Sequence, residues 1–416
     1  MDDMTMRRCI ERKRSGAELE PAVWEDVIGG YVAGTVDDAQ MAAMAMACNW
    51  RGLSVEEAAA MTRAMVASGE TLSYPDGVTV VDKHSSGGVS DIISMVAVPI
   101  VAACGVRVAK LSGRALGHTG GTIDKLETIP GFDVDLAMDA FVRQVESVGC
   151  AIAAQTDAFV PADKRLYKLR DRTGTVPNLG LIASSIVSKK VAGGAHAFVF
   201  DVKCGEAAFM TKPHDAIELA EALVGISQQF GRRARAIVSD MNEPLGRSIG
   251  TGVEVVEARE FLRGEVQIPR VKSLCIQIAD AMLTLAGVEN GADEATRALH
   301  SGTAYEKFCE LIEAQRGSVA GFEAMRRSPH VTVLRAPGTG YVQEIDTVAL
   351  GNAGRALSDV DPMAGLRVAV HEGESVTAGD ALIEIYGANP ELAPVEAAFR
   401  VGEAPPRARP LVYATV

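Results

Sequence analysis

Between residues 78 and 238, short β-branched runs alternate with longer segments of helical periodicity. The runs that look like strands span residues 78–81, 106–109, 151–154, 197–202 and 234–238. Helices fit the segments between them, most clearly residues 91–104 and 214–229. Strands that alternate with helices pair as a mostly parallel sheet, because each crossover returns the chain to the same end of the sheet. The alternation therefore predicts an α/β lobe.

Two other regions lack strand signals and are expected to be helical. Residues 7–68 show helical patterns, and Ser54 with Glu57 forms a capping box at the start of a helix over residues 55–66. Residues 162–192 are helical and rich in basic residues. This second segment can return to the first, so that both belong to one small helical lobe.

The chain changes character again near residue 331. A long helical stretch over residues 271–314 gives way to a β-rich tail that we expect to be rich in turns. Seven glycines mark this tail: Gly338, Gly340, Gly351, Gly354, Gly365, Gly373 and Gly379. The pattern predicts an α/β fold with a small helical lobe, a large mixed α/β lobe and a β-rich C-terminal subdomain. The lobes are assigned to residues 1–66 and 162–192, to residues 67–161 and 193–330, and to residues 331–416.

The charge balance limits the kinds of partner. The chain has 54 Asp and Glu residues against 41 Lys and Arg residues, which gives a net charge of −13. The acidic residues are spread along the chain, so no nucleic-acid-binding surface is expected. The overall field also repels anions, and any anionic ligand must therefore be held by a local pocket of donors.

Neither a membrane protein nor an exported protein is predicted. The most apolar stretch, residues 92–106, contains Pro99 and is shorter than the roughly 20 residues that a spanning helix needs. Residues 1–14 lack the apolar region of a signal peptide. The seven cysteines lie far apart and form no C-x-x-C pair, which favours reduced thiols in the cytoplasm and no zinc site.

A first glycine-rich loop, VDKHSSGGVSD at residues 81–91, lies between a predicted strand and a predicted helix. Its paired glycines let the backbone turn tightly, so that several N–H groups can face one anion at the start of the helix. Lys83 adds a positive charge, and Ser85 and Ser94 can donate hydroxyl hydrogen bonds. The loop has neither the Walker spacing nor G-x-G-x-x-G, which argues against a nucleoside triphosphate or a dinucleotide.

A second glycine-rich loop, KLSGRALGHTGGTIDKLE at residues 110–127, also follows a predicted strand. Open α/β sheets bind ligands at the carboxyl ends of their strands, so the two loops can share one phosphate. Ser112 and Thr122 would complete its shell of donors. The other polar residues of the loop are interpreted as structural: His118, and Arg114 held by Asp124 or Glu127.

Together the loops resemble the signature of the thymidine and pyrimidine-nucleoside phosphorylase family, K-H-S-T-G-G-V-G-D followed by S-G-R-G-L-x-H-T-G-G-T-x-D-K-L-E. The resemblance continues through residues 155–156, 161–164, 169–171 and 183–190, and it persists to Tyr413. It implies an enzyme that reversibly cleaves a pyrimidine nucleoside with inorganic phosphate as co-substrate and without an organic cofactor. The implied products are the free base and ribose or deoxyribose 1-phosphate, and the implied assembly is a homodimer formed through the small lobe.

The resemblance also implies roles for individual residues. Phosphate is assigned to Lys83, Ser85, Ser94, Ser112 and Thr122. The pyrimidine is assigned to Arg170, Ser185 and Lys189, with His84 near the base and the sugar. Cleavage of the N-glycosidic bond places negative charge on the departing base, so cations around the base are expected. His84, Arg170 and Lys189 are therefore the expected catalytic residues.

Lys110 bears on the choice of sugar and is expected to contact both phosphate and the nucleoside. By the resemblance, this position is Lys in members that accept uridine and Met in thymidine-specific members. Lys110 therefore favours a broad enzyme that acts on uridine, thymidine and deoxyuridine. A thymidine-specific phosphorylase is the alternative.

The chain also departs from the family pattern. Ser90 stands where the family usually has Gly, residues 250–255 read GTGVEV instead of G-N-A-x-E-V, and Glu206 and residues 177–180 are unusual. Some members of the family hold a potassium ion through backbone carbonyls of these loops and a carboxylate. Its ligands would be Ser90, Ile92, Leu245, Ser248 and Glu257.

Two other functions are weighed against phosphorolysis. Anthranilate phosphoribosyltransferase has a similar architecture, but its acidic metal-binding pair is not identifiable in this sequence. A protein that only binds nucleosides would be expected to lose Lys83, Arg170 or Lys189, and all three are present. Catalysis is expected to need closure of the lobes about residues 73–78, 156–161 and 191–196.

Overall fold

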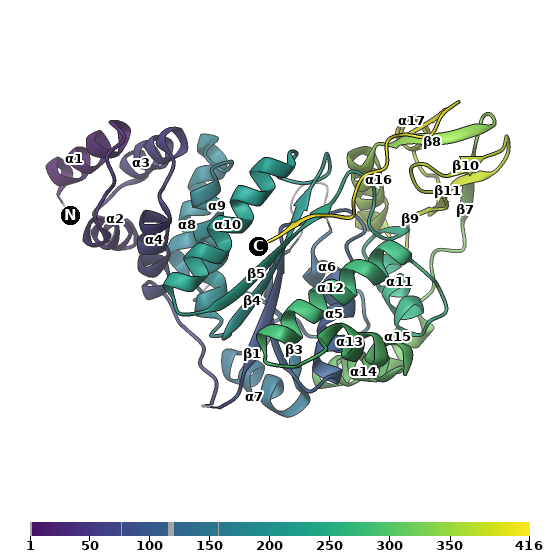
Figure 1. Ribbon diagram of the computed structural model, residues 1–416, viewed down its shortest axis with the longest axis horizontal. Helices are drawn as coiled ribbons and strands as arrows, with labels where there is room; N and C mark the ends of the chain where they lie inside the picture. The colour runs from purple at the N-terminus through teal and green to yellow at the C-terminus, as the bar shows by residue number, and fades with distance from the viewer. Residues whose placement is uncertain (1, 76, 115–119, 157) are drawn as a thin grey trace.

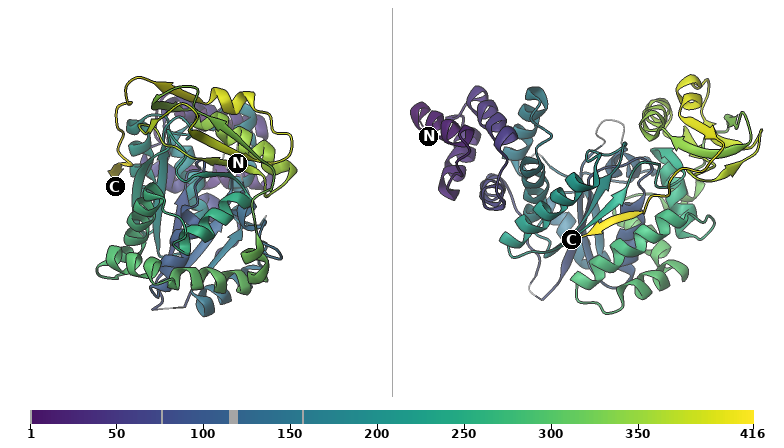
Figure 2. Two further views of the ribbon diagram at one scale, coloured as in Figure 1. Left: turned by 90° about the vertical axis from the view of Figure 1, so that its right-hand side faces the viewer. Right: turned by 45° about the horizontal axis from the view of Figure 1, so that its top comes forward.

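The computed structural model describes residues 2–75, 77–114, 120–156 and 158–416 (Figure 1). A central sheet lies between a bundle of helices at one end of the molecule and a β-rich region at the other (Figures 1 and 2). The strand order of the sheet is β13-β5-β4-β1-β2-β3. Its strands are β1 (Val80–Ser85), β2 (Arg107–Ser112), β3 (Cys150–Ala154), β4 (Ala197–Cys204), β5 (Arg233–Asp240) and β13 (Val412–Thr415).

The predicted parallel sheet is confirmed. Strands β1 to β5 pair in parallel, and only β13 runs antiparallel, along the outer edge of β5. Four strands extend further at their carboxyl ends than the aliphatic runs predicted. The residues added to β1, β2 and β4 include Lys83, Lys110 and Lys203, and all three are buried. Charged side chains therefore lie inside the sheet at the end where ligands are expected.

Alternation along the strands creates one hydrophobic core on each face of the sheet. Val81 and Val199 belong to the core that contains α5 (Ile93–Ala103) and α12 (Pro269–Leu285). Their neighbours Val80 and Phe198 belong to the core that contains α9 (Leu179–Ala192) and α10 (Pro213–Gln229). The other helices of the large lobe are α6 (Thr122–Leu126), α7 (Met138–Val148), α11 (Gly252–Leu262), α13 (Gly291–His300), α14 (Thr303–Ala314) and α15 (Val319–Ala324).

The helical bundle combines the four N-terminal helices with α8 (Pro161–Thr173) and α9, which both lie between β3 and β4 in the chain. Its members are α1 (Asp3–Arg14), α2 (Pro21–Ala33), α3 (Asp38–Arg51), α4 (Val55–Ala67), α8 and α9. The predicted capping box is present at α4, and the same Glu57 carboxylate pairs with buried Lys13 at 2.5 Å. Arg165 of α8 lies over the ring of Tyr31 in α2, which joins the inserted helix to the N-terminal bundle.

The chain segments that connect the bundle to the sheet run side by side. The Leu72 N–H donates to the Ala192 carbonyl at 2.8 Å, and the Glu70 N–H donates to the Ala158 carbonyl at 3.2 Å. Gly194 has a φ of 76°, and a Cβ at this position would lie 2.3 Å from the Leu72 carbonyl oxygen. Only glycine allows this close approach.

The C-terminal region is rich in β-structure, as predicted. It contains β7 (Val331–Arg335), β8 (Gly340–Ile345), β9 (Gly365–Val368), β10 (Ser375–Val376), β11 (Ala381–Tyr386), β12 (Phe399–Gly402) and α17 (Ala393–Ala397), and β6 (Ser248–Gly250) joins β9. The assignment of Gly351 and Gly354 to turns is wrong, because both lie in α16 (Thr347–Val360). A Cβ at Gly354 would lie 2.7 Å from the Ile249 side chain, so here glycine permits close helix packing. Every helix in the described part of the chain is too short or too polar to span a bilayer.

Candidate active site

A cavity of about 600 Å³ lies where the carboxyl ends of β1 and β2 meet the helices α8 and α9. The strand register brings the two glycine-rich loops to this edge, because Ser85 ends β1 and Ser112 ends β2. The lining includes nine of the residues predicted for ligand binding: His84, Ser85, Ser94, Lys110, Ser112, Thr122, Arg170, Ser185 and Lys189. Residues that are far apart in the sequence therefore share one space.

The wall formed by the two loops carries hydroxyl groups. Ser85, Ser94, Ser112 and Thr122 line it, and the Ser85 hydroxyl donates to Asp91 at 2.7 Å. Lys83 is not among the described lining residues. Its ammonium lies behind this wall, 3.4 Å from Ser94 Oγ.

Two basic side chains in this wall have lowered pKa values. Lys110 is 2% exposed, and its Nζ donates to the Lys83 carbonyl at 2.9 Å. Burial and the nearby charge of Lys190 lower the pKa of Lys110 to about 7. Burial and the surrounding lysines also hold the pKa of His84 well below its ordinary value. His84 is therefore a neutral imidazole near pH 7, able to donate one hydrogen bond and accept another.

The opposite wall is formed by α8 and α9. Lys189 pairs with the Asp163 carboxylate, and its Nζ donates to Ser185 Oγ at 2.9 Å. Arg170 is 1% exposed and donates to the carbonyls of three residues: Thr175, Val176 and Leu181. Arg170 thus holds the connection between the two helices while it lines the cavity, a structural contribution that its sequence context did not reveal.

Several lining residues had no role assigned from the sequence. Lys190 is buried, and its Nζ contacts Asp82 at 2.7 Å and the Leu111 carbonyl at 2.8 Å. Asp163 pairs with Lys189. Both residues lie in segments that match the family pattern, and this match is the feature of the sequence that could have identified them. Aromatic and aliphatic side chains complete the lining, among them Tyr167, Ile182, Ile186 and Phe209. They can cover the flat face of a base.

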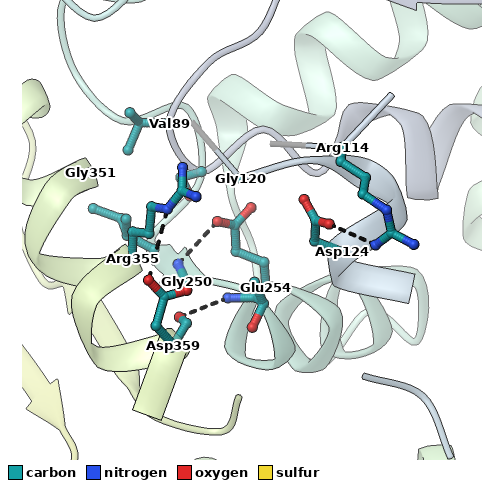
Figure 3. Close-up of a pocket in the computed structure, with 13 residues that line it drawn as sticks. Val89, Arg114, Gly120, Asp124, Gly250, Glu254, Gly351, Arg355 and Asp359 are labelled. Atoms are coloured by element: carbon teal, nitrogen blue, oxygen red, sulfur yellow. Dashed lines mark hydrogen bonds and ion pairs between the residues drawn. The ribbon is translucent and has the colours of Figure 1, made fainter. Parts of the chain in front are cut away.

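A second cavity, of about 390 Å³, lies between the second glycine-rich loop, α11 and α16 (Figure 3). Arg114 lines both cavities and pairs with Asp124 at 3.2 Å and with Glu127 at 2.5 and 2.7 Å. The structural interpretation of Arg114 is confirmed. His118 lies outside the described residues.

Three of the residues predicted for potassium come together beside this second cavity: Ser90 lines the cavity, and the Ser248 N–H donates to Glu257 Oε1 at 2.9 Å. Ser90 has a φ of 57°, so it keeps the left-handed backbone conformation that glycine adopts readily. A Cβ at Gly246 would lie 2.7 Å from Ser90 Oγ and 2.5 Å from Glu257 Oε2, so both oxygens face the same residue. The hydroxyl of Ser90 is buried and has no hydrogen-bond partner among the described residues. Burial raises the pKa of Glu257.

The chain is similar to known proteins over nearly its whole length. Residues 77–305 match the glycosyl transferase family, a/b domain, and residues 7–69 match the helical bundle domain of that family. A pyrimidine-nucleoside phosphorylase of Geobacillus stearothermophilus is 42% identical, with 99% of each chain covered. A thymidine phosphorylase of Mycobacterium tuberculosis strain H37Rv is also 42% identical, over 97% of this chain and 96% of the other.

The chain belongs to the thymidine and pyrimidine-nucleoside phosphorylase family. Relatives with each of the two names are equally similar to it, so identity alone does not separate the two kinds of member of this family.

A solved structure shares the fold. The anthranilate phosphoribosyltransferase of Thermus thermophilus superimposes with a TM-score of 0.60 over 74% of this chain and 99% of the other, at 23% identity. The sequence predicted an α/β architecture with a small helical domain. This solved structure has the same architecture.

Proposed function

We propose that this protein catalyses the reversible phosphorolysis of pyrimidine nucleosides, with the free base and ribose or deoxyribose 1-phosphate as products. The observation that carries the proposal is one cavity in which the hydroxyl-lined loops share the space with Lys189 and Arg170. The names of the relatives support the same reaction.

In the proposed reaction, a phosphate oxygen attacks C1′ of the sugar as the bond from C1′ to the base nitrogen breaks. The electron pair of that bond leaves with the base, so the base becomes negatively charged. Lys189 and Arg170 stabilise this charge, and Ser185 helps to orient the base. The hydroxyls of Ser85, Ser94, Ser112 and Thr122 hold the phosphate, and Lys83 supplies charge behind them. His84, a neutral imidazole, hydrogen-bonds the base or the sugar.

Lys110 favours the broad activity over the thymidine-specific one. It lines the cavity at the end of β2, where an ammonium can reach a phosphate oxygen and a sugar hydroxyl. A hydrogen bond to the 2′-hydroxyl is available only with ribonucleosides. Specificity for thymidine is the second candidate, because relatives with that name are equally similar.

We also propose a potassium site built from Ser90, Ile92, Leu245, Ser248 and Glu257. The backbone carbonyls of these loops and the buried carboxylate of Glu257 would provide the oxygen ligands that an unhydrated potassium ion needs, and the buried Ser90 hydroxyl, which lacks a partner among the described residues, supports this site. When bound, the ion would balance the charge of Glu257 and join the first glycine-rich loop to α11.

We further propose a homodimer formed through the small lobe. Met46 and Trp50 lie four residues apart on α3 and are 44% and 76% exposed, so they form an apolar stripe on one face of that helix. Burial of this stripe against a second copy would remove it from water.

The seven free thiols support a cytoplasmic location.

The first prediction concerns the reaction itself. Uridine, thymidine and deoxyuridine should release free base only when phosphate is present. Lys189→Ala should lower turnover by more than about tenfold, roughly 1.4 kcal/mol, because the charge on the departing base loses its cation. Arg172→Ala removes an exposed cation of the same helical lobe and should leave turnover near that of the wild type. Base release that proceeds without phosphate, or transfer of a phosphoribosyl group from phosphoribosyl pyrophosphate in place of phosphorolysis, would contradict the proposal.

The second prediction concerns Lys110. Its ammonium loses a proton as the pH rises through about 7, so the ratio of kcat/KM for uridine to that for deoxyuridine should fall across this range. The titration of phosphate cancels in this ratio. In Lys110→Met the ratio should be independent of pH and lower than the wild-type ratio at pH 6 by roughly five- to hundredfold, the effect of one charge-assisted hydrogen bond. Equal losses for the two nucleosides would show that Lys110 does not distinguish the sugars.

The third prediction tests the potassium site by stability. Potassium chloride should raise the melting temperature above that in choline chloride at the same ionic strength, because a ligand that binds only the folded state stabilises it. Glu257→Gln should abolish the difference. A melting temperature that responds equally to both salts would rule out a specific site.

The fourth prediction tests the assembly. Trp50→Asp should convert a dimer to a monomer in sedimentation equilibrium, because a carboxylate in an apolar interface has no partner. Val360→Asp changes another apolar residue, 88% exposed on α16, and it should leave the mass unchanged. A wild type that sediments as a monomer would overturn the proposal.

A further inference from the structure

Two charged residues interrupt the apolar strand β4, AFVFDVKC. All eight residues of this strand are buried, and the side chains of Asp201 and Lys203 are fully enclosed. They lie two residues apart and therefore point to the same face of the sheet. Charged groups are rarely buried without a partner, and no role has yet been assigned to either of these.

The Asp201 carboxylate is shared by two ammonium groups. Its Oδ2 lies 2.7 Å from Lys203 Nζ and 3.2 Å from Lys83 Nζ, and its Oδ1 accepts a hydrogen bond from Ser239 Oγ at 2.6 Å. Lys203 is therefore the nearer of the two cations. It also lies 3.8 Å from Asp91, the carboxylate that accepts the Ser85 hydroxyl.

Lys83 connects this buried group to the cavity. Its ammonium contacts Ser94 Oγ at 3.4 Å, and Ser94 lines the cavity. An anion at this wall attracts the ammonium away from Asp201. With no other cation, Asp201 would then be a buried charge without a partner, which is strongly unfavourable. Lys203 remains at 2.7 Å and removes that penalty.

We propose that Lys203 is a positioning residue for the anion: it neutralises Asp201, so that the ammonium of Lys83 is available to phosphate at Ser85 and Ser94. This inference rests on the proposed function, since it assumes that phosphate binds at this wall. Lys203 itself lies beneath Gly88 of the first glycine-rich loop, where a Cβ would be 3.6 Å from Lys203 Cε. It acts through Asp201 and Lys83 and does not touch the phosphate.

The test is calorimetric titration of the full chain with inorganic phosphate alone, so that it does not depend on turnover. Lys203→Met should weaken phosphate binding by about tenfold or more, because Asp201 then retains Lys83. The double variant Lys203→Met/Asp201→Asn should recover wild-type affinity to within about threefold, because it removes the competing carboxylate as well. Asp201→Asn alone should bind phosphate at least as tightly as the wild type.

Lys13→Met provides the matched control. It breaks another buried lysine–carboxylate pair, with Glu57, in the helical bundle. It should lower the melting temperature while leaving phosphate affinity unchanged.

The outcomes separate the two proposals. If the wild type cleaves nucleosides but Lys203→Met binds phosphate normally, or the double variant does not recover, Lys203 has only a structural role and the inference is wrong. If Lys203→Met does not fold, weaker phosphate binding by Asp201→Asn overturns the inference and unchanged or tighter binding supports it. A wild type that binds phosphate but cleaves no nucleoside refutes the proposed reaction alone. A wild type that does not bind phosphate overturns both.

Discussion

Several amino groups lie in the dry interior at the carboxyl edge of the sheet, and the active site depends on how their charges are balanced. Lys83 and Lys203 share Asp201, and Lys190 pairs with Asp82. A buried ammonium is stable only with such a partner, whereas a fully balanced set has no charge left for a ligand. The arrangement resolves this conflict by placing hydroxyls at the cavity wall and the cations just behind them. An acidic protein can thereby hold an anion at one point without a basic surface.

Lys110 differs from these paired lysines. Its Nζ donates a hydrogen bond to the neutral carbonyl of Lys83, and the Lys110 ammonium lies near the positive charge of Lys190. A neutral acceptor compensates a buried cation only in part, which is why its pKa falls to about 7. The pKa of Lys203 is instead raised, because Asp201 and Asp91 outweigh the effect of burial. Two lysines near the same cavity thus have pKa values shifted in opposite directions. Near neutral pH, the charge of Lys110 responds to what binds beside it.

The cavity is shared by two parts of the chain. The loops belong to the sheet, whereas Arg170, Ser185 and Lys189 belong to α8 and α9, which the chain reaches through adjacent crossings. Backbone hydrogen bonds join these crossings to one another, and Gly194 lies close to the Leu72 carbonyl and the Tyr74 ring. We propose that the lobes close about these crossings, which would bring the two walls of the cavity together once both substrates are in place.

The sequence by itself determined the sheet, the capping box, the two glycine-rich loops and, through a long motif, the family. These depend on local periodicity and on residues close together in the chain. It did not reveal α16, because Gly351 and Gly354 are typical of turns, whereas in the fold Gly354 packs closely against Ile249 of β6 within this helix. The strands were predicted too short for a related reason: polar residues such as Lys83 and Lys203 break the aliphatic pattern. Inside the sheet both ammonium groups are compensated by Asp201, which lies on the same strand as Lys203 and on the strand next to that of Lys83. Tertiary structure likewise decided that Arg170 donates hydrogen bonds to three carbonyls and that Asp201 lies between two lysines. A carboxylate on β4 can compensate a lysine on β1 only after the strands pair, and no spacing along the chain records that contact.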